Sequence, residues 1–357
     1  MALAIRMSAP SLDGSLTPSI PPMKAYQTNP HFCWRSSGSA TAVGIVAIKM
    51  YRSLKRFRAR NRKRVERTVL TDDLFTLPND KVALEVLGGK AKDSVSRVSL
   101  VCIHGSYHAA WCYEAFYLDF FREHGLNAYA LSLRGQGQGK MPDQLPVAGT
   151  LEEHASDVAS FVRQLEKEGQ RVILLGHSFG GLITLKAAAD LDMLAGLVLL
   201  CSVPPSGNVG IILRSLLRAP LQAFRITWGF ISRAFERDAK LCQELFFDKE
   251  TSLADVGDYM ELMKKGCPPG TRLLDLRQLQ GSLPVPVCTK PVLVLGGEMD
   301  VIVDAEALEE TAKAHGVEPN ILQGVAHDAM LGSRWRLSAE AILEWIKIQD
   351  FVADGKV

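Results

Sequence analysis

The stretch RVILLGHSFGGLITLKAAAD, residues 171–190, contains the turn that decides the fold. Residues 171–175 form an apolar run typical of a short buried strand, and residues 182–190 have the composition of a helix. Between them, residues 176–180 read GHSFG and fit the pattern G-x-S-x-G. A strand that turns into a helix at a single residue forces a strained backbone there. It also lifts the hydroxyl of Ser178 off the sheet edge, at a helix N-terminus that favours developing negative charge.

The two glycines of this pattern have a steric reason. In so sharp a turn Gly176 and Gly180 come close together, and a side chain at either position would clash. The sequence therefore predicts that Ser178 is a nucleophile.

Composition and charge argue against several classes of function. The net charge of +2 is unevenly distributed, because residues 1–65 hold 12 Lys/Arg and one acid, Asp13. The remainder has 41 − 12 = 29 basic and 39 − 1 = 38 acidic residues, a net charge of −9, which gives no electrostatic reason to bind nucleic acid. The seven cysteines are scattered and form no CxxC pair, which argues against a disulfide framework or a zinc site.

Residues 1–65 have the composition of a targeting segment rather than of a folded domain. They are rich in Ser, Ala and Pro, nearly free of acids, and end in the basic run KMYRSLKRFRARNRKRV. This pattern predicts a transit peptide for the chloroplast, with the mitochondrion or the cytoplasm as alternatives. A disordered basic tail is the competing interpretation. The short apolar patch TAVGIVAIKMY leaves open a peripheral contact with an anionic membrane.

From Glu66 onward, strand and helix patterns alternate. Such alternation predicts an α/β protein with a mostly parallel sheet covered by helices on both faces. Residues 203–288 interrupt the alternation with a mostly helical segment, which we interpret as a cap over the carboxyl ends of the strands. The predicted organisation is thus a targeting segment in residues 1–65, an α/β core in 66–202 and 289–357, and a helical cap inserted in 203–288.

Two further residues complete a candidate catalytic triad. Asp300 follows the strand pattern VLVLGG, and His327 closes ILQGVAH. An activated serine needs a base, and the base needs an orienting acid, so we predict Ser178, His327 and Asp300 in these roles. Glu298 competes with Asp300 for the role of the acid.

The oxyanion hole needs two backbone N–H groups. One is expected from Phe179, directly after the nucleophile, and the other from Ser106 in the loop IHGSYHAAW. Gly105 gives that loop the freedom to approach the substrate. Three histidines flank these groups: we expect His104 to brace the loop and His177 to pack, while His108 either lines the pocket or is structural.

These motifs resemble the α/β-hydrolase superfamily over roughly residues 72–350. VCIHGSYHAAWCY and GHSFGG resemble the plant branch of methylesterases and hydroxynitrile lyases, and GGEMDVIV and GVAHDAML resemble the acid and histidine segments. The resemblance implies an eight-stranded, mostly parallel sheet, an inserted helical cap, no cofactor and the hydrolysis of esters. Gln136 stands where many members have a histidine in the sequence Arg-Gly-His-Gly, a change that should not touch the chemistry.

The leading functional prediction is a serine hydrolase that cleaves a small or lipophilic carboxylic ester. The alternatives are an acyltransferase, a lipid or thioester hydrolase at a plastid membrane, a lyase of the hydroxynitrile type that needs a pocket lysine, and a non-catalytic binding protein. The residue at the strand–helix turn is a serine. Dehalogenases and epoxide hydrolases of this fold use an aspartate at that position, so the serine argues against both. No metal, cofactor or protein partner is predicted.

The predicted cap has more large apolar residues than one narrow buried stripe needs. Either it packs on the core with solvated arginines, or part of it lines an acyl pocket or meets a membrane. The apolar set is Ile211, Leu213, Leu216, Leu217, Leu221, Phe224, Ile226, Trp228, Phe230, Ile231 and Phe235, and Arg214, Arg218, Arg225, Arg233 and Arg237 are interleaved with it.

Overall fold

The computed structural model describes residues 74–77, 82–92, 96–140, 145–267, 270–274, 288, 290–349 and 351. The predicted targeting segment in residues 1–65 lies outside this part of the chain. Among the described helices, none is both long and apolar enough to cross a membrane.

Eight strands form one sheet with the order β1-β2-β4-β3-β5-β6-β7-β8. Their bounds are β1 Leu74–Thr76, β2 Ala83–Gly89, β3 Val98–Ile103, β4 Asn127–Ser132, β5 Arg171–His177, β6 Gly196–Leu200, β7 Val292–Gly297 and β8 Asn320–Leu322. The β1–β2 and β2–β4 pairs are antiparallel, and the other five pairs are parallel. The prediction of a mostly parallel eight-stranded sheet is confirmed.

Helices connect the strands and form the cap. Their bounds are α2 Trp111–Glu114, α3 Tyr117–Glu123, α4 Leu151–Lys167, α5 Phe179–Ala188, α6 Val209–Arg218, α7 Pro220–Ile231, the 3-10 helix η2 Ala234–Glu236, α8 Ala239–Phe246, α9 Leu253–Gly266, α10 Ala305–Ala314 and α11 Trp335–Ile348. At the start of α4, Thr150 and Glu153 form a capping box, which satisfies two backbone donors at the helix end.

Two apolar cores lie on opposite faces of the sheet. One contains buried side chains of α4, α5 and α10, and the other those of α2, α3 and α11 together with α8 and α9 of the cap. Side chains of the central strands are buried on both faces of the sheet. All six residues of β3 are buried, as a strand between two helical layers requires.

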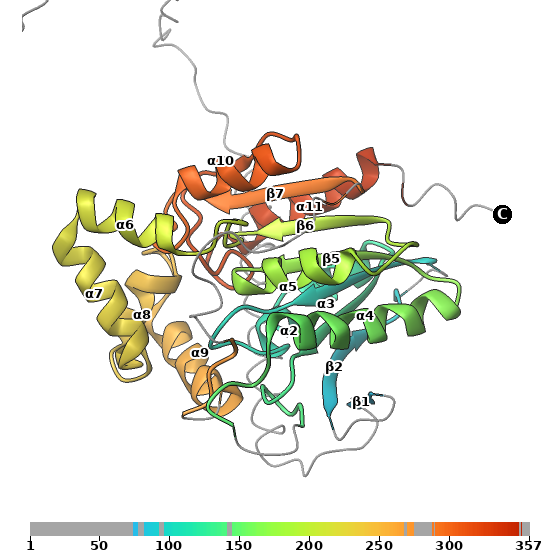
Figure 1. Ribbon diagram of the computed structural model, residues 1–357, viewed down its shortest axis with the longest axis horizontal. Helices are drawn as coiled ribbons and strands as arrows, with labels where there is room; N and C mark the ends of the chain where they lie inside the picture. Colours follow the sequence, from blue (N-terminus) through green and yellow to red (C-terminus); the bar gives the residue numbers. More distant parts are fainter. Residues whose placement is uncertain are drawn as a thin grey trace, which may run out of the picture. The chain divides into compact units, whose positions relative to one another are not determined.

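The helices α6 to α9 follow β6 and precede β7 in the chain, inside the range predicted for the cap. Figure 1 shows them beyond the ends toward which the arrows of β6 and β7 point. These carboxyl ends are where open α/β sheets hold their ligands. The boundaries 203 and 288 stay a prediction, because parts of 268–289 lie outside the described residues.

Candidate active site

The turn between β5 and α5 consists of the single residue Ser178. Its backbone lies at φ 54° and ψ −123°, a conformation that costs a side-chain-bearing residue free energy and is found where function requires it. A Cβ on Gly176 would lie 2.5 Å from the carbonyl oxygen of Gly180, and one on Gly180 would lie 2.6 Å from that of His104. Both glycines are therefore required sterically, as the sequence predicts.

The predicted base and acid are in contact. His327 donates a hydrogen bond from Nδ1 to Oδ2 of Asp300 at 2.8 Å. The other oxygen of Asp300 accepts the backbone N–H groups of Ile302 and Val303 at 2.8 and 2.9 Å. The carboxylate is thereby held in one orientation, and Nε2 of His327 is the nitrogen left to accept a proton.

The competing acid is elsewhere. The carboxylate of Glu298 accepts the backbone N–H of Gly324 at 3.0 Å, and its side chain is exposed. The structure thus pairs Asp300, and not Glu298, with the histidine.

The electrostatics of His327 suit a general base. Burial acts to lower the pKa of this imidazole, but the charge and hydrogen bond of Asp300, with a smaller effect of Asp328, outweigh it. The net result is a pKa raised above the ordinary value. A raised pKa makes His327 a stronger proton acceptor than a free histidine.

The loop after β3, the predicted oxyanion loop, lies against Ser178. A Cβ on Gly105 would lie only 2.7 Å from Cβ of Ser178, so the absence of a side chain there permits the approach. Ser106 and Phe179 both line the cavity that contains Ser178. Because Phe179 is the first residue of α5, its N–H has no partner inside the helix and is available to an oxyanion.

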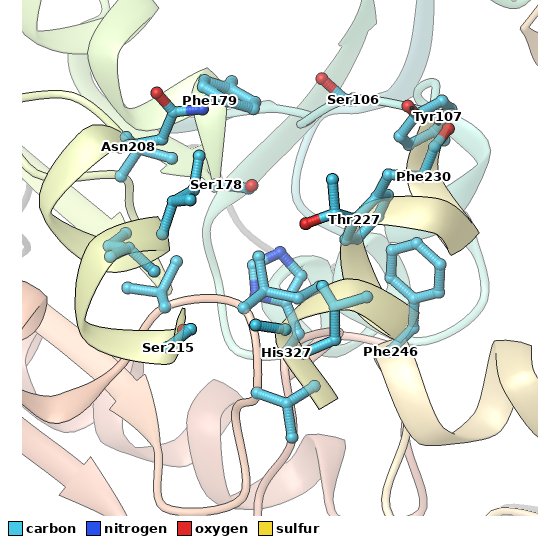
Figure 2. A pocket seen from close by; sticks show the side chains of 18 of the residues that line it. Ser106, Tyr107, Ser178, Phe179, Asn208, Ser215, Thr227, Phe230, Phe246 and His327 are labelled. Carbon is cyan, nitrogen blue, oxygen red and sulfur yellow. Dashed lines mark hydrogen bonds between the residues drawn. The ribbon is translucent and has the colours of Figure 1, made fainter. Parts of the chain in front are cut away.

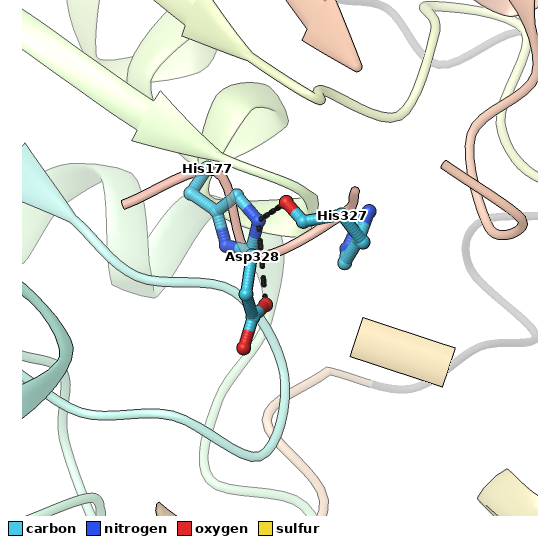
Figure 3. Close-up of side chains that lie close together, drawn as sticks. All are labelled: His177, His327 and Asp328. Carbon is cyan, nitrogen blue, oxygen red and sulfur yellow. Dashed lines mark hydrogen bonds and ion pairs between the residues drawn. The ribbon is translucent and has the colours of Figure 1, made fainter. Parts of the chain in front are cut away.

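Two of the flanking histidines are structural, as expected. His104 donates from Nδ1 to the carbonyl of Gly105 at 2.8 Å and accepts the N–H of Leu133 at 3.0 Å, which joins the oxyanion loop to the end of β4. Burial lowers the pKa of His104 to about 3, so it stays neutral. His177 donates from Nε2 to the carbonyl of His327 at 3.0 Å and so holds the backbone of that residue (Figure 3).

A second His–Asp pair was not predicted. His108 lines the cavity; its Nδ1 donates to the carbonyl of Ser106 at 2.9 Å, and its Nε2 lies 2.8 Å from Oδ2 of Asp328. Both ring nitrogens lie within hydrogen-bond distance of acceptors, so the ring is held between the carbonyl of Ser106 and the carboxylate of Asp328. The pair connects the predicted oxyanion loop to the residue after His327. No local sequence signal marks this pair, because His108 and Asp328 lie 220 positions apart in the chain.

Ser178 and His327 face one cavity of about 360 Å³ between the sheet edge and the cap (Figure 2). The inner sides of α6 and α7 supply much of its wall, including Ile211, Ile226 and Phe230. Most of the remaining lining is apolar as well. The predicted apolar set of the cap is therefore divided, because some members line this cavity and Phe235 is buried in the core.

Tyr107 connects the oxyanion loop to the cap. Its ring stacks on Phe230 with centroids 5.7 Å apart, and its hydroxyl donates to the carbonyl of Phe230 at 3.1 Å. Its backbone has φ 65°, which is unusual for a residue with a side chain. The cap and the oxyanion loop are thus positioned together.

Two groups of described side chains lie close enough to share a metal ion, and both include His327. In one, the Nε2 of His177 already donates to a backbone carbonyl. In the other, Nδ1 of His327 already bonds Asp300. Each group thus contains a nitrogen that is already engaged in a hydrogen bond.

Three features define the α/β-hydrolase class. They are a serine at a strained strand–helix turn, a His–Asp pair at later strand ends, and a cap over the carboxyl ends of the strands. A model of the alpha/beta hydrolase family matches residues 100–341, more than half of the 357-residue chain. The chain belongs to this family.

Similar proteins agree with this assignment. Esterase PIR7B of Oryza sativa subsp. japonica is 30% identical over 113 residues, which span 31% of this chain and 41% of that protein. A carbendazim hydrolyzing esterase of Nocardioides sp. (strain SG-4G) is 27% identical over 164 residues, which span 45% of this chain and 66% of that protein. The chain thus matches less than half of the length of the rice relative.

Solved structures share the fold. A thermophilic esterase from Thermogutta terrifontis has a TM-score of 0.55 at 18% identity, covering 78% of this chain and 97% of its own. A soluble variant of monoglyceride lipase from Saccharomyces cerevisiae has a TM-score of 0.57 at 16% identity, covering 80% and 97%. At such identities the similarity shows the fold alone.

Proposed function

We propose that this protein is a serine hydrolase that cleaves a carboxylic ester with a lipophilic acyl or alcohol group. The observation that carries the proposal is the placement of Ser178 and His327 on one apolar cavity, with Asp300 bonded to the far side of the imidazole. The esterase names of the relatives support the same reaction.

In the first half of the reaction, Oγ of Ser178 attacks the carbonyl carbon of the ester, and Nε2 of His327 takes the hydroxyl proton. Asp300 stabilises the imidazolium that forms. The carbonyl oxygen becomes an oxyanion and accepts hydrogen bonds from the N–H groups of Phe179 and Ser106. When the tetrahedral intermediate collapses, the carbon–oxygen bond to the alcohol breaks, and His327 gives its proton to that alcohol.

In the second half, water replaces the alcohol. His327 takes a proton from the water as the remaining hydroxide bonds to the acyl carbon. The acyl–Oγ bond then breaks, Ser178 regains its proton from His327, and the carboxylic acid leaves. If an alcohol enters in place of water, the same steps transfer the acyl group.

The lining of the cavity argues against the lyase alternative. A lyase of the hydroxynitrile type needs a lysine in the pocket, and among the described residues that line this cavity there is none. Apolar walls instead favour a hydrocarbon chain, since each buried methylene contributes up to about 0.8 kcal/mol.

The test is the turnover of a series of p-nitrophenyl esters from acetate to decanoate, with and without added alcohol. We expect kcat/KM to rise by up to about fourfold per methylene over the first steps. Release of free acid identifies a hydrolase, and formation of a new ester identifies an acyltransferase. No turnover above that of a Ser178→Ala variant across the series would refute the proposal.

For residues 1–65 we propose import into the chloroplast, on the strength of their acid-poor, Ser-rich and basic composition. A fusion of residues 1–70 to a fluorescent protein should accumulate in plastids. A cytosolic or mitochondrial distribution of the fusion would contradict this proposal.

A further inference from the structure

The outer sides of α6 and α7 expose an unusual number of large apolar side chains. Their exposed fractions run from 44% at Ile212 to 86% at Leu221. We call this set the outer apolar face: Val209, Ile212, Leu213, Leu216, Leu217, Leu221, Phe224, Trp228 and Ile231. Contiguous patches of this kind on a folded protein mark a site of interaction.

The set is ordered along each helix. In α6 its members are three, one, three and one residues apart, and in α7 they are three, four and three residues apart. Such spacings place side chains on one side of a helix, so each helix presents a single apolar stripe outward. Leu217 and Leu221, which are 77% and 86% exposed, flank the junction of the helices, which forms the outermost corner of the cap (Figure 1).

The charges on these two helices are all positive. Residues 209–231 contain Arg214, Arg218 and Arg225 and no Asp or Glu. Arg214 is tied to Asp304 through two hydrogen bonds of 2.7 and 2.6 Å, so α6 is fixed to the core below it. Arg218 pairs with Glu306, and Arg225 pairs with Glu244 at 2.9 Å. The side chains of both pairs are about half exposed, so the pairs contribute little to stability.

The opposite sides of the same helices line the catalytic cavity. Val209, Ile212 and Ile231 belong to both surfaces, since each lines the cavity and is at least 44% exposed. An apolar path therefore leads from the outer apolar face to the nucleophile, without an intervening charged side chain on these helices.

We propose that the outer apolar face docks on a phospholipid bilayer, and that the cavity takes its ester directly from that membrane. The two helices carry leucine, phenylalanine and tryptophan on one side, have arginine as their only charged residue, and end in a protruding apolar corner. These features fit the boundary between the head groups and the acyl chains of a bilayer. The docking stands on its own, whereas the delivery of a lipid ester rests on the proposed function.

The experiment is flotation of the full-length protein with phosphatidylcholine vesicles. These lipids have no net charge, so the basic residues of 1–65 gain no net electrostatic attraction. The test variant is Leu217→Gln with Leu221→Gln, which leaves the lining of the catalytic cavity intact. The matched control is Met193→Gln with Ile348→Gln, two apolar residues of similar exposure, 68% and 71%, outside the cap.

We expect the natural protein and the control to bind equally, and the test variant to bind at least about tenfold more weakly. All should hydrolyse a soluble short-chain ester at the same rate. Brominated phosphatidylcholine should quench the fluorescence of Trp228, a loss that is absent in Trp228→Phe. Because flotation does not need turnover, a Ser178→Ala protein should bind as well, which separates failure of docking from failure of the proposed hydrolysis.

Equal binding of the test variant and the natural protein would overturn the proposal, as would no binding of either. So would binding only to anionic vesicles that is unchanged in the test variant, because residues 1–65 would then explain it. A dimer in sedimentation velocity that the test variant abolishes, without vesicle binding, would assign the outer apolar face to a second copy of the chain.

Discussion

At the scale of the residue, the carboxylate of Asp300 accepts hydrogen bonds from Nδ1 of His327 and from the backbone N–H groups of Ile302 and Val303. Asp300→Asn keeps the shape of the side chain but can no longer fix the correct imidazole tautomer. We expect kcat to fall by about 10³- to 10⁴-fold, with little change in thermal unfolding. Steady-state kinetics beside a melting curve measure both, and a larger loss in Glu298→Gln would mean that the acid is wrongly assigned.

The pH dependence follows from His327, which must be neutral to accept a proton. Burial lowers its pKa, but Asp300 raises it by more, so the net pKa lies above the ordinary 6.5. Activity should therefore be lost as pH falls, with the midpoint of kcat/KM above pH 6.5. In Asp300→Asn the midpoint should move to lower pH, because the charge that raises the pKa is gone. A midpoint that does not move would contradict this cause.

The pair of His108 and Asp328 gives a third prediction. Asp328→Ala removes the partner of Nε2 of His108, and with it the support of the Ser106 carbonyl in the oxyanion loop. The loss of one buried hydrogen bond should lower kcat by about tenfold and leave KM nearly unchanged. Asp328→Asn can donate an N–H to Nε2 and should retain most of the activity. Equal losses in both variants, or a loss confined to stability, would assign the pair a structural role only.

The candidate triad could be predicted from the sequence because each member carries a local mark. Ser178 stands between two glycines at the end of an apolar run, and Asp300 and His327 each follow a strand pattern. Asp328 carries no such mark. Its significance depends on a contact with His108, 220 positions away in the chain, and no local pattern encodes that contact.

At the scale of the element, periodicity predicted the strands and the positions of the major helices. The alternation of strands and helices and the single-residue turn before α5 match the sequence patterns. The cap was harder, because nearly every turn of its helices is apolar. Periodicity alone cannot say which apolar side faces the cavity and which faces outward, and the contacts with the core decide that.

The contact between the cap and the core provides an element-scale prediction. Arg214 of α6 binds Asp304, which caps the N-terminus of α10 four residues after Asp300. Arg214→Ala should loosen α6 and so raise KM for long-chain esters, whose tails contact its inner side. Because the pair is about a quarter exposed, the free energy of unfolding should fall by only about 0–1 kcal/mol. Ester kinetics at two chain lengths test this, and a larger effect on the acetate ester would contradict it.

At the scale of the whole molecule, the fold explains why chemistry and specificity come from different parts of the chain. The parallel strands bring Ser178, Asp300 and His327 to one edge, and the inserted helices cover that edge with an apolar wall. The arrangement of the catalytic residues is readable from sequence because it depends on strand ends. The identity of the ester depends on the shape of the cavity under α6 and α7, which strand ends do not determine.

The most direct test of the central claim, that Ser178 is the nucleophile of a serine hydrolase, is intact-mass spectrometry after treatment with a fluorophosphonate. The account predicts one covalent adduct per chain, located by peptide mapping on Ser178, together with loss of ester turnover in proportion to labelling. Ser178→Ala should take no label and turn over no ester, while its melting temperature stays close to that of the natural protein. An adduct on another residue, or ester turnover that survives in Ser178→Ala, would contradict the account.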